Sequence, residues 1–309
     1  MSGPVTSTDA PVDDEVGPAA TGPTIERRPS RLADVGGMAV RRALPRHDRR
    51  TVGAWCFVDH FGPTDDGFMQ IGPHPHVGLQ TVTWLLAGEA LHRDSLGSEQ
   101  LVRPGQLNLM TSGAGIVHAE ESPTGLRGEA HGAQLWVALP EETRHGPGAF
   151  EHHADLPVVG AGGLAVTVLV GDLDGVRSPA RADTALLGLA LTGSGAGTLT
   201  LQPTFEHALV VLDGTVAVGD EVVAPGELAY LGLGRDELTL DPSPGAHALL
   251  LGGVPFPERI AMWWNFVGRT KDEMAQAWRD WEDGADRFGP VASELGRIPA
   301  PAFIDPGRR

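Results

Sequence analysis

The sequence predicts an all-β protein built from two related β-barrel domains, and three observations carry this prediction. Gly (42) and Pro (25) together make up more than a fifth of the 309 residues, which favours turns and short strands over long helices. Between residues 37 and 243, short apolar runs are separated by Gly, Pro and Asp. One pattern of strands and glycine turns occurs twice, and the chain length is itself typical of two domains.

The apolar runs have the length and composition of strands. Several are rich in β-branched or aromatic residues, which suit a pleated, half-buried surface. The runs are Gln80–Ala87, Leu107–Thr111, Gln134–Leu139, Leu164–Val170, Leu186–Thr192 and Ala208–Leu212. Many short strands separated by turn residues predict a sandwich or a barrel.

The repeated unit is a strand, a glycine turn, a second strand, a Pro-Gly turn and a third strand. In the first copy the turns lie at Gly88 and Pro104–Gly105, and in the second at Gly214 and Pro225–Gly226. The copies are about 125 residues apart, which is the size of a domain and too large for a solenoid repeat. We therefore expect two barrels of the same design.

Helical periodicity is confined to the C-terminal region. Thr270 followed by Glu273 forms a capping box, which marks the start of a helix. Met274, Trp278 and Trp281 then fall on one helical face. We expect this stripe to pack against the sheet rather than to bind a cofactor.

The composition excludes several classes of protein. A net charge of −17 argues against a basic groove for nucleic acid. Cys56 is the single cysteine, so neither an intramolecular disulfide nor a Cys-rich zinc site can form, and we expect its thiol to be buried. Residues 1–24 lack the features of a secretory signal, and no apolar stretch of about 18 residues predicts a membrane span. We expect a cytoplasmic protein with no membrane and no direct nucleic-acid partner.

The histidines are concentrated in the first half, where ten of the 12 lie at or before His153. His74 and His76 are two residues apart, so in an extended segment both imidazoles lie on the same face. His118 and Glu120 repeat this spacing. On neighbouring strands the two pairs would supply three imidazoles and a carboxylate. Such a set suits divalent iron, nickel, copper or manganese and leaves positions open for substrate. Taken alone, either pair is explained about as well by chance as by a metal site, whereas the two pairs together favour a metal site.

The other histidines are assigned different places. We expect His92 to lie at the barrel rim or to contact a metal-binding side chain, rather than to bind the metal itself. His145 and His152–His153 lie in a polar stretch that we interpret as a solvated linker. His131 fits either a surface position or the metal site, and His60 is a candidate for the barrel mouth.

These residues resemble the pirin family of the cupin superfamily. The matching segments are Arg42–Pro45, Phe57–Pro63, Pro73–Val82, Met110–Glu120, Leu135–Pro140, Trp264–Val267 and Asp272–Glu273. The match covers roughly residues 35–140 well and the C-terminal segment moderately, whereas the second barrel matches mainly by pattern. The most specific part is the pair of motifs, with His118 placed 42 positions after His76.

The resemblance implies a bicupin, that is, two tandem cupin-type β-barrels with a short C-terminal helix. The N-terminal barrel would hold one divalent transition metal, with iron expected and nickel, copper, manganese or zinc as alternatives. By position, the metal ligands would be His74, His76, His118 and Glu120. The chain departs from the family at Val77, Leu79 and Gln80, where pirins commonly carry Arg, Phe or Tyr, and Glu.

Two functions follow from the resemblance. The first is an iron-dependent dioxygenase of the quercetin 2,3-dioxygenase type, which acts on a flavonol, another small aromatic compound or an enediol. In that enzyme Glu120 would be the catalytic residue that shuttles the substrate proton. The alternative is a non-enzymatic, redox- or metal-responsive regulatory protein that binds a partner protein. The residues expected to line the pocket are Leu79, Trp84, Leu109, Met110 and Trp136, although simple barrel core is the plainer interpretation for most of them.

The second barrel is expected to be a scaffold without metal. Aligning the two repeats on their turns places Thr200, Gln202, Thr239 and Asp241 at the ligand positions, with His207 the one imidazole nearby. Transition-metal sites normally have three or four protein ligands, which this set does not supply. We expect the C-terminal helix to cover one side of this barrel. The expected organisation is a disordered tail (1–30), an N-terminal metal-binding barrel (31–145), a C-terminal barrel without metal (146–255) and a C-terminal helical segment packed on the barrels (256–309).

Overall fold

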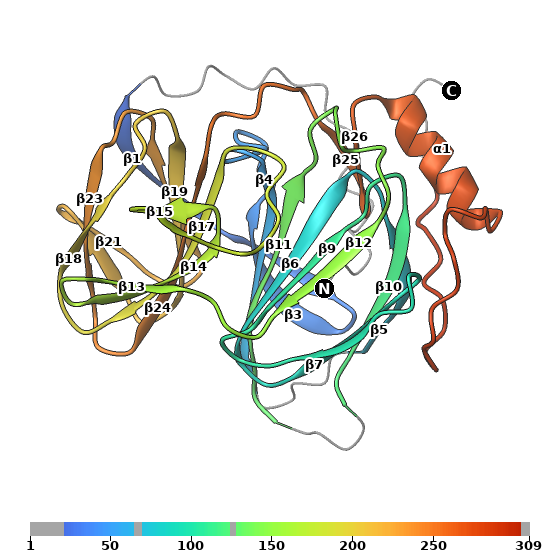
Figure 1. Ribbon diagram of the computed structural model, residues 1–309, viewed down its shortest axis with the longest axis horizontal. Coiled ribbons are helices and arrows are strands. Elements are labelled where there is room, and N and C mark those ends of the chain that lie inside the picture. The colour runs from blue at the N-terminus through green and yellow to red at the C-terminus, as the bar shows by residue number, and fades with distance from the viewer. Residues whose placement is uncertain (1–21, 65–69, 124–127, 304–309) are drawn as a thin grey trace.

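The computed structural model of the chain describes residues 22–64, 70–123 and 128–303. Two β-barrels lie side by side, and the helix α1 (Lys271–Glu282) lies at one end of the molecule (Figure 1). The predicted all-β fold with a short C-terminal helix is confirmed.

The first barrel consists of a seven-stranded sheet and a four-stranded sheet. The larger sheet has the order β12-β9-β6-β11-β4-β3-β2, and the smaller sheet has the order β5-β10-β7-β8. The strands of the larger sheet are β2 (Arg31–Val35), β3 (Met38–Leu44), β4 (Trp55–Thr64), β6 (Leu79–Ala87), β9 (Leu107–Thr111), β11 (Ala130–Ala138) and β12 (Ala149–His153). Those of the smaller sheet are β5 (Gln70–His76), β7 (Ala90–Asp94), β8 (Glu99–Val102) and β10 (Ile116–Glu121).

The second barrel has the same composition of sheets. Its seven-stranded sheet has the order β1-β22-β19-β24-β17-β14-β13, and its four-stranded sheet the order β18-β23-β20-β21. The strands are β1 (Pro23–Pro29), β13 (Val158–Ala161), β14 (Leu164–Val170), β17 (Leu186–Gly193), β18 (Gly197–Thr200), β19 (Glu206–Asp213), β20 (Val216–Val218), β21 (Glu221–Val223), β22 (Glu227–Gly232), β23 (Glu237–Pro242) and β24 (Ala246–Gly253). A hairpin of β15 (Asp172–Leu173) and β16 (Val176–Arg177) is attached.

The internal repeat found in the sequence corresponds to matching hairpins. The strands β6 to β9 of the first barrel correspond in order to β19 to β22 of the second, with Gly88 and Gly214 in the first turn of each unit. Both glycines have positive φ, +85° at Gly88 and +64° at Gly214. A Cβ at Gly88 would lie 2.6 Å from the carbonyl oxygen of Glu129. These turns therefore need glycine, which is why they stood out in the sequence.

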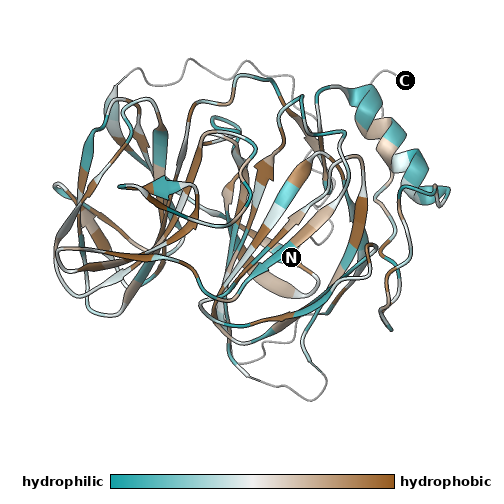
Figure 2. Ribbon diagram, in the orientation of Figure 1, coloured by the Kyte–Doolittle hydropathy of each residue, from teal (hydrophilic) through white to brown (hydrophobic). Residues whose placement is uncertain are grey.

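The junction between the barrels is filled by an apolar core. Val82, Trp84 and Leu135 from the first barrel belong to the same buried cluster as Val210 and Leu249 from the second. Figure 2 shows the apolar residues along the strands of both barrels, whereas α1 is mostly hydrophilic.

Two buried hydrogen bonds also cross the junction. The Trp55 indole donates to the carbonyl of Leu187 (2.9 Å), and the backbone N–H of Gly53 donates to the Glu206 carboxylate (2.7 Å). The close-packed apolar interface and these bonds fix the barrels against each other.

The C-terminal segment packs on the first barrel. Thr270 caps α1 as predicted, with its Oγ1 accepting a hydrogen bond from the backbone of Glu273 (3.2 Å). The buried face of the helix is Met274, Ala277 and Trp281, while Trp278 is half-buried. Contacts run to a hairpin of β25 (Ala261–Trp263) and β26 (Phe266–Gly268) beside β5 and β10.

The prediction that this helix covers one side of the second barrel is wrong. The apolar surface that it needs, formed by Val117, Trp264 and Phe266, lies on the outside of the first barrel. In Figure 1 the helix stands at the opposite end of the molecule from the second barrel.

Two domain boundaries also differ from those expected. Residues 23–29, placed in the disordered tail, form β1 and pair with β22 of the second barrel. His152 and His153, placed in a solvated linker, belong to β12 and pair with β9 of the first barrel. Long-range strand pairing decides both cases, and neither segment carries the apolar alternation that would predict it. The predicted tail residues 1–21 lie outside the described residues.

The interior of the second barrel is apolar where the first carries histidines. The strands β18 and β23 correspond to β5 and β10, and they bury Leu199, Leu238 and Leu240. Thr200, Gln202, Thr239 and Asp241 are exposed, so the alignment on turns slipped by one residue and selected the outer face. The absence of a metal from this barrel stays a prediction, now supported by leucines at the interior positions.

Candidate metal centre

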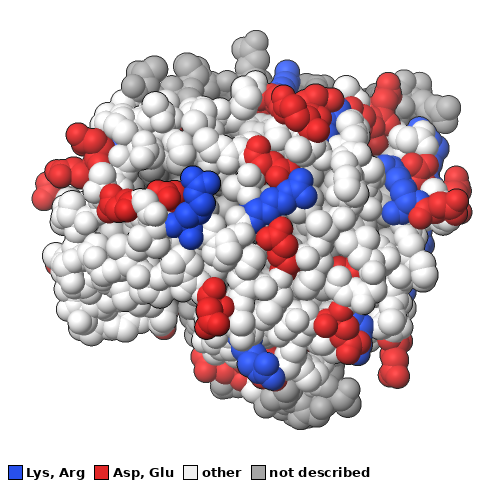
Figure 3. All heavy atoms as spheres, viewed as in Figure 1, with Lys and Arg blue, Asp and Glu red and all other residues white. Residues whose placement is uncertain are grey.

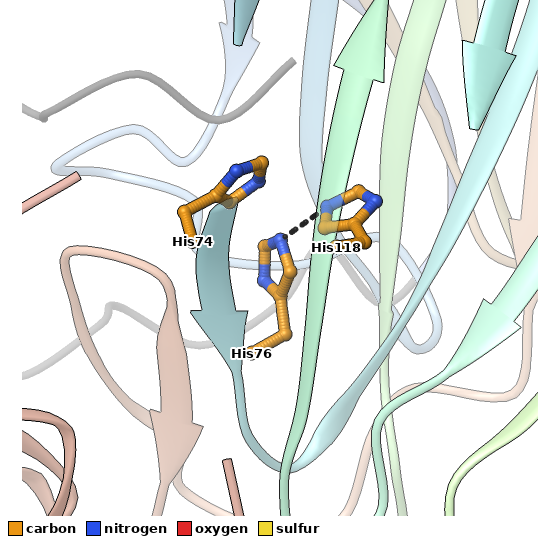
Figure 4. Close-up of side chains that lie close together, drawn as sticks. All are labelled: His74, His76 and His118. Carbon is orange, nitrogen blue, oxygen red and sulfur yellow. Dashed lines mark hydrogen bonds between the residues drawn. The ribbon is translucent and has the colours of Figure 1, made fainter. Parts of the chain in front are cut away.

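Three histidines from two neighbouring strands meet inside the first barrel. The strands β5 and β10 are antiparallel, and His74 lies directly opposite His118. His76 is two residues further along β5 and therefore lies on the same face. One nitrogen atom from each of the three rings lies within 4.8 Å of the others. Figure 4 shows the three rings pointing toward one another from the two strands. The spacing in the sequence thus predicted this proximity correctly.

Hydrogen bonds orient two of these rings. Nδ1 of His74 lies 2.8 Å from the carbonyl oxygen of Gly72, and Nδ1 of His76 lies 3.1 Å from that of Asn265. A carbonyl only accepts, so the proton of each ring is on Nδ1 and the lone pair is on Nε2. Metal-binding histidines are commonly held in this way.

Burial keeps all three imidazoles neutral. Desolvation lowers the pKa of His74 to about 4, and it lowers the pKa of His76 and of His118 well below the ordinary value. At neutral pH each ring is therefore an uncharged donor. A neutral imidazole is the form that binds a metal ion.

The donor set fits a transition metal. Nε2 of His76 and Nε2 of His118 are 3.1 Å apart, and His76 holds its proton on the other nitrogen. Two nitrogen atoms that approach so closely need a proton or a cation between them. Three neutral imidazoles suit divalent iron, nickel, copper, manganese or zinc.

Glu120 is close by, but it does not belong to this group of three. The register of β10 against β5 shifts after His118, so that Glu120 lies opposite Ile71. Its side chain is buried, and its charge raises the pKa of His74 against the larger lowering by burial. Oε1 of Glu120 lies 3.4 Å from Oγ1 of Thr83. The structure therefore brings together three of the four predicted ligands, and the role of Glu120 stays a prediction.

His92 and Asp94 on β7 extend the cluster. Nδ1 of His92 lies 3.4 Å from Nδ1 of His118, and its Nε2 lies 3.1 Å from Oδ2 of Asp94. The ring of His92 stacks on Phe150 of β12, with the ring centroids 4.3 Å apart. We expected His92 at the rim or against a ligand, and it contacts His118. We did not single out Asp94, although the spacing of His92 and Asp94 matches that of His74 and His76.

Other polar residues also face the interior of the first barrel, although we did not predict them from the sequence. Thr83 and Gln134 are direct partners on β6 and β11, and both are buried. Oγ1 of Thr83 donates to Oε1 of Gln134 (2.9 Å). Nε2 of Gln134 has no hydrogen-bond partner within the described parts of the chain. Alternation along β6 and β11 is the signal that would have found them.

The residues expected to line the pocket divide between two faces of the sheet. The Trp136 ring lies edge-on to His76 at 5.2 Å and packs with Leu79, so both are near the site. Met110 is buried on β9 and alternates with Leu109. Trp84 and Leu109 instead belong to the core between the barrels. The prediction that these two residues line the pocket is therefore wrong.

Gln80, one of the residues at which the chain departs from the family pattern, also lies away from the three histidines. Gln80 shares the outer face of β6 with Val82 and Trp84, which belong to the core between the barrels. Its Nε2 donates to Oγ1 of Thr111 (3.0 Å). Gln80 therefore lies on the side of β6 that faces the junction of the barrels.

The remaining histidines of the first half lie outside the group of three. His60 and His131 are buried together, with their Nε2 atoms 3.0 Å apart. His145 is exposed, whereas His152 is partly buried and its Nδ1 lies 2.7 Å from Oδ1 of Asn108. Cys56 is buried, and burial raises the pKa of its thiol to about 12, as expected of a structural cysteine.

The surface carries mixed charges on the side drawn in Figure 3. There, Lys and Arg occur as small separate groups beside Asp and Glu. Within the described residues, no helix is long and apolar enough to cross a membrane.

Comparisons with known proteins agree with this geometry. Residues 37–137 match the Pirin family, and residues 187–289 match the family described as the Pirin C-terminal cupin domain. A putative quercetin 2,3-dioxygenase of Pseudomonas aeruginosa is 52% identical over 284 residues, covering 90% of each chain. A pirin-like protein of Caulobacter vibrioides is 36% identical, covering 82% of this chain and 92% of its own.

Solved structures include a close relative. A crystal structure of quercetin 2,3-dioxygenase from Acinetobacter baumannii superposes with a TM-score of 0.86 at 42% identity, covering 91% of this chain and 96% of the other. The matched families span most of both barrels, and the N-terminal one contains the three histidines. The chain is therefore a member of the pirin family with two cupin domains.

Proposed function

We propose that the protein is a metal-dependent dioxygenase of the quercetin 2,3-dioxygenase type, with iron as the expected metal and a flavonol or enediol as substrate. The observation that carries the proposal is the convergence of three buried, neutral imidazoles inside the first barrel. The names of the relatives from P. aeruginosa and A. baumannii support the substrate class. Glu120 is proposed as the fourth ligand and as the catalytic carboxylate.

Each part of the site has a role in this reaction. His74, His76 and His118 would hold the ion, which when bound would act as a Lewis acid toward a substrate oxygen and as the redox partner for O2. Glu120 would accept the proton of the substrate hydroxyl, because it is the buried carboxylate beside the imidazoles. Phe57 and Trp136, stacked at 4.0 Å, supply apolar walls that exclude water.

Gln134 adds a polar contact for the substrate. Its Oε1 is occupied by the Thr83 hydroxyl, which leaves Nε2 as a buried donor without a partner among the described residues. A buried donor without a partner carries an unfavourable desolvation cost, and an acceptor atom of a bound substrate would remove that cost. An oxygen-rich ring system supplies such acceptors.

Turnover under air tests the proposal. We expect iron-loaded protein to consume quercetin together with O2, to lose this activity on chelation and to regain it on reloading. Metal analysis of the same sample identifies the ion that the site retains. Loaded protein that stays inert toward a panel of flavonols and enediols would contradict the dioxygenase and would favour the metal-responsive regulatory protein that binds a partner protein.

A further inference from the structure

The core between the barrels leaves a cavity of about 520 Å³. The first barrel contributes residues 84–86 at the end of β6, and the second contributes Thr167 on β14 and residues 190–192 on β17. Residues 154–156, which link β12 to β13, form a further part of the wall. Sites for small molecules have volumes of this order and are frequent at domain interfaces. The size and position of the cavity are therefore those of a binding site.

This cavity lies on the opposite side of β6 from the metal centre. Neighbouring residues on a strand face opposite sides. Trp84 lines the cavity, whereas Oγ1 of the preceding Thr83 lies 3.4 Å from Oε1 of Glu120. The three histidines of the metal centre are not among the residues that line the cavity. A molecule bound in the cavity therefore does not contact the metal centre.

Most of the wall is apolar, and part of it is left uncovered. Trp84, Ala190 and Leu212 belong to the buried core between the barrels. Leu86 and Leu156 pack against that core but remain partly exposed. Close-packed protein interiors leave few spaces larger than a water molecule, so an apolar cavity of this size is unusual. An aromatic molecule suits it, because filling the space removes apolar surface from water and rings pack favourably against an indole.

The charge at the cavity is negative. Asp155 lines it and forms no ion pair within the described parts of the chain. Asp213 directly follows Leu212 of the wall. The described residues that line the cavity include neither Lys nor Arg. An unpaired carboxylate attracts a cation and repels an anion, so the charge favours a positively charged ligand.

We propose that this cavity binds an aromatic molecule that carries a protonated amine. The aromatic part fills the apolar space, and the ammonium group pairs with the carboxylate of Asp155. This inference is independent of the proposed function, because no residue of the metal centre takes part in the binding.

Three fluorescent compounds with one ring system test the class of ligand. They are 1-pyrenemethylamine, 1-pyrenemethanol and 1-pyrenecarboxylate, which are positively charged, neutral and negatively charged at pH 7. By fluorescence anisotropy at low salt, we expect the amine to bind about threefold more tightly than the alcohol, as is typical of an exposed ion pair, and the carboxylate to bind most weakly. Asp155→Asn should remove the difference between amine and alcohol. Asp220→Asn is the control, at an exposed aspartate outside the cavity.

A second variant tests where the compounds bind. Thr167 is half-buried on β14, and in Thr167→Phe the larger ring occupies the space of the cavity while still suiting a strand. We expect the affinity for 1-pyrenemethylamine to fall about tenfold, because the ligand loses most of its buried surface. Thr198→Phe, at an exposed threonine of β18 outside the cavity, should bind the amine as the natural protein does. Circular dichroism establishes that both variants fold.

The outcomes separate this site from the metal centre. Unchanged binding in a folded Thr167→Phe, or equal affinities of the natural protein for all three compounds, would overturn the inference. A preference for the amine that persists in Asp155→Asn would overturn it as well, even if Thr167→Phe failed to fold. Loading with Ni²⁺ should leave the affinity for the amine unchanged, and displacement of the amine by quercetin would place it at the wrong site. Binding as expected without turnover of quercetin would count against the dioxygenase alone.

Discussion

The hydroxyl of Thr83 donates a hydrogen bond to Oε1 of Gln134, its direct partner across two neighbouring strands, over 2.9 Å. The same hydroxyl oxygen lies 3.4 Å from Oε1 of Glu120 on the opposite sheet. One small side chain thus stands between the proposed catalytic carboxylate and the proposed amide donor. Its hydroxyl contacts both groups.

Thr83→Val tests this relationship, because valine has nearly the same shape but no hydroxyl. We expect metal affinity, measured by competition with a chelator, to fall by about tenfold, since residues that orient ligands affect affinity on this scale. Thr83→Ser should retain most of the affinity. Thr81→Val is the control, being a buried threonine on the same strand and face. Equal affinities for Thr83→Val and Thr81→Val would show that the hydroxyl does not support the site.

His76→Ala is expected to remove most of the bound metal while the chain still folds. The reason is that the loss of one imidazole removes a bond to the ion, so the remaining ligands bind it more weakly. Elemental analysis of the purified variant, with circular dichroism to establish folding, gives the answer. His145→Ala, at an exposed histidine, should leave the metal content unchanged. Full occupancy in His76→Ala would remove the basis for the assigned site.

Arg42 and Asp59 form a buried ion pair inside the first barrel. Two hydrogen bonds of 2.8 and 2.7 Å join them, and both side chains are almost completely buried. Breaking such a pair leaves an uncompensated charge, so Arg42→Met should lower the free energy of unfolding by about 3–5 kcal/mol. The double variant Arg42→Met/Asp59→Leu should recover a large part of this loss. Urea unfolding measures both, and a double variant as unstable as the sum of the single variants would contradict the explanation.

His60 makes the protein sensitive to acid. Desolvation, with the positive charge of Arg41 and the neighbouring His131, lowers the pKa of His60 to about 3, while Asp213 opposes this. Because the folded pKa is below the unfolded one, the stabilisation is complete above about pH 6.5 and declines as the pH falls toward 3.

At pH 5 this group alone should have reduced the free energy of unfolding by about 2 kcal/mol relative to pH 7.5. The difference between urea midpoints at the two pH values should therefore be smaller in His60→Leu than in the natural protein. His145→Ala should keep the full difference. An unchanged difference in His60→Leu would show that His60 does not titrate between the two states.

The sequence was most informative where a local pattern has one structural outcome. Gly88 and Gly214 adopt positive φ, so the turns and the duplicated unit were visible from glycine alone. The i, i+2 spacing of His74 and His76 places both rings on one face of a strand, and Thr270 with Glu273 forms the capping box at the start of α1.

Where pairing joins distant segments, local patterns carried no information. The strand β1 looked like a tail because its partner, β22, lies some 200 residues away. The alignment of the second barrel missed its interior by one residue, because neighbouring residues on a strand face opposite sides.

The two barrels, the capped helix and the group of three histidines could be predicted from the sequence, because short-range geometry settles turns, caps and strand faces. The folded chain alone shows that Trp84 fills the junction between the barrels, and that Asp94 contacts His92, which in turn contacts His118. It also shows that α1 covers the first barrel. Each of these depends on which surfaces meet when the sheets close, and this is set by packing of the whole chain rather than by any one segment.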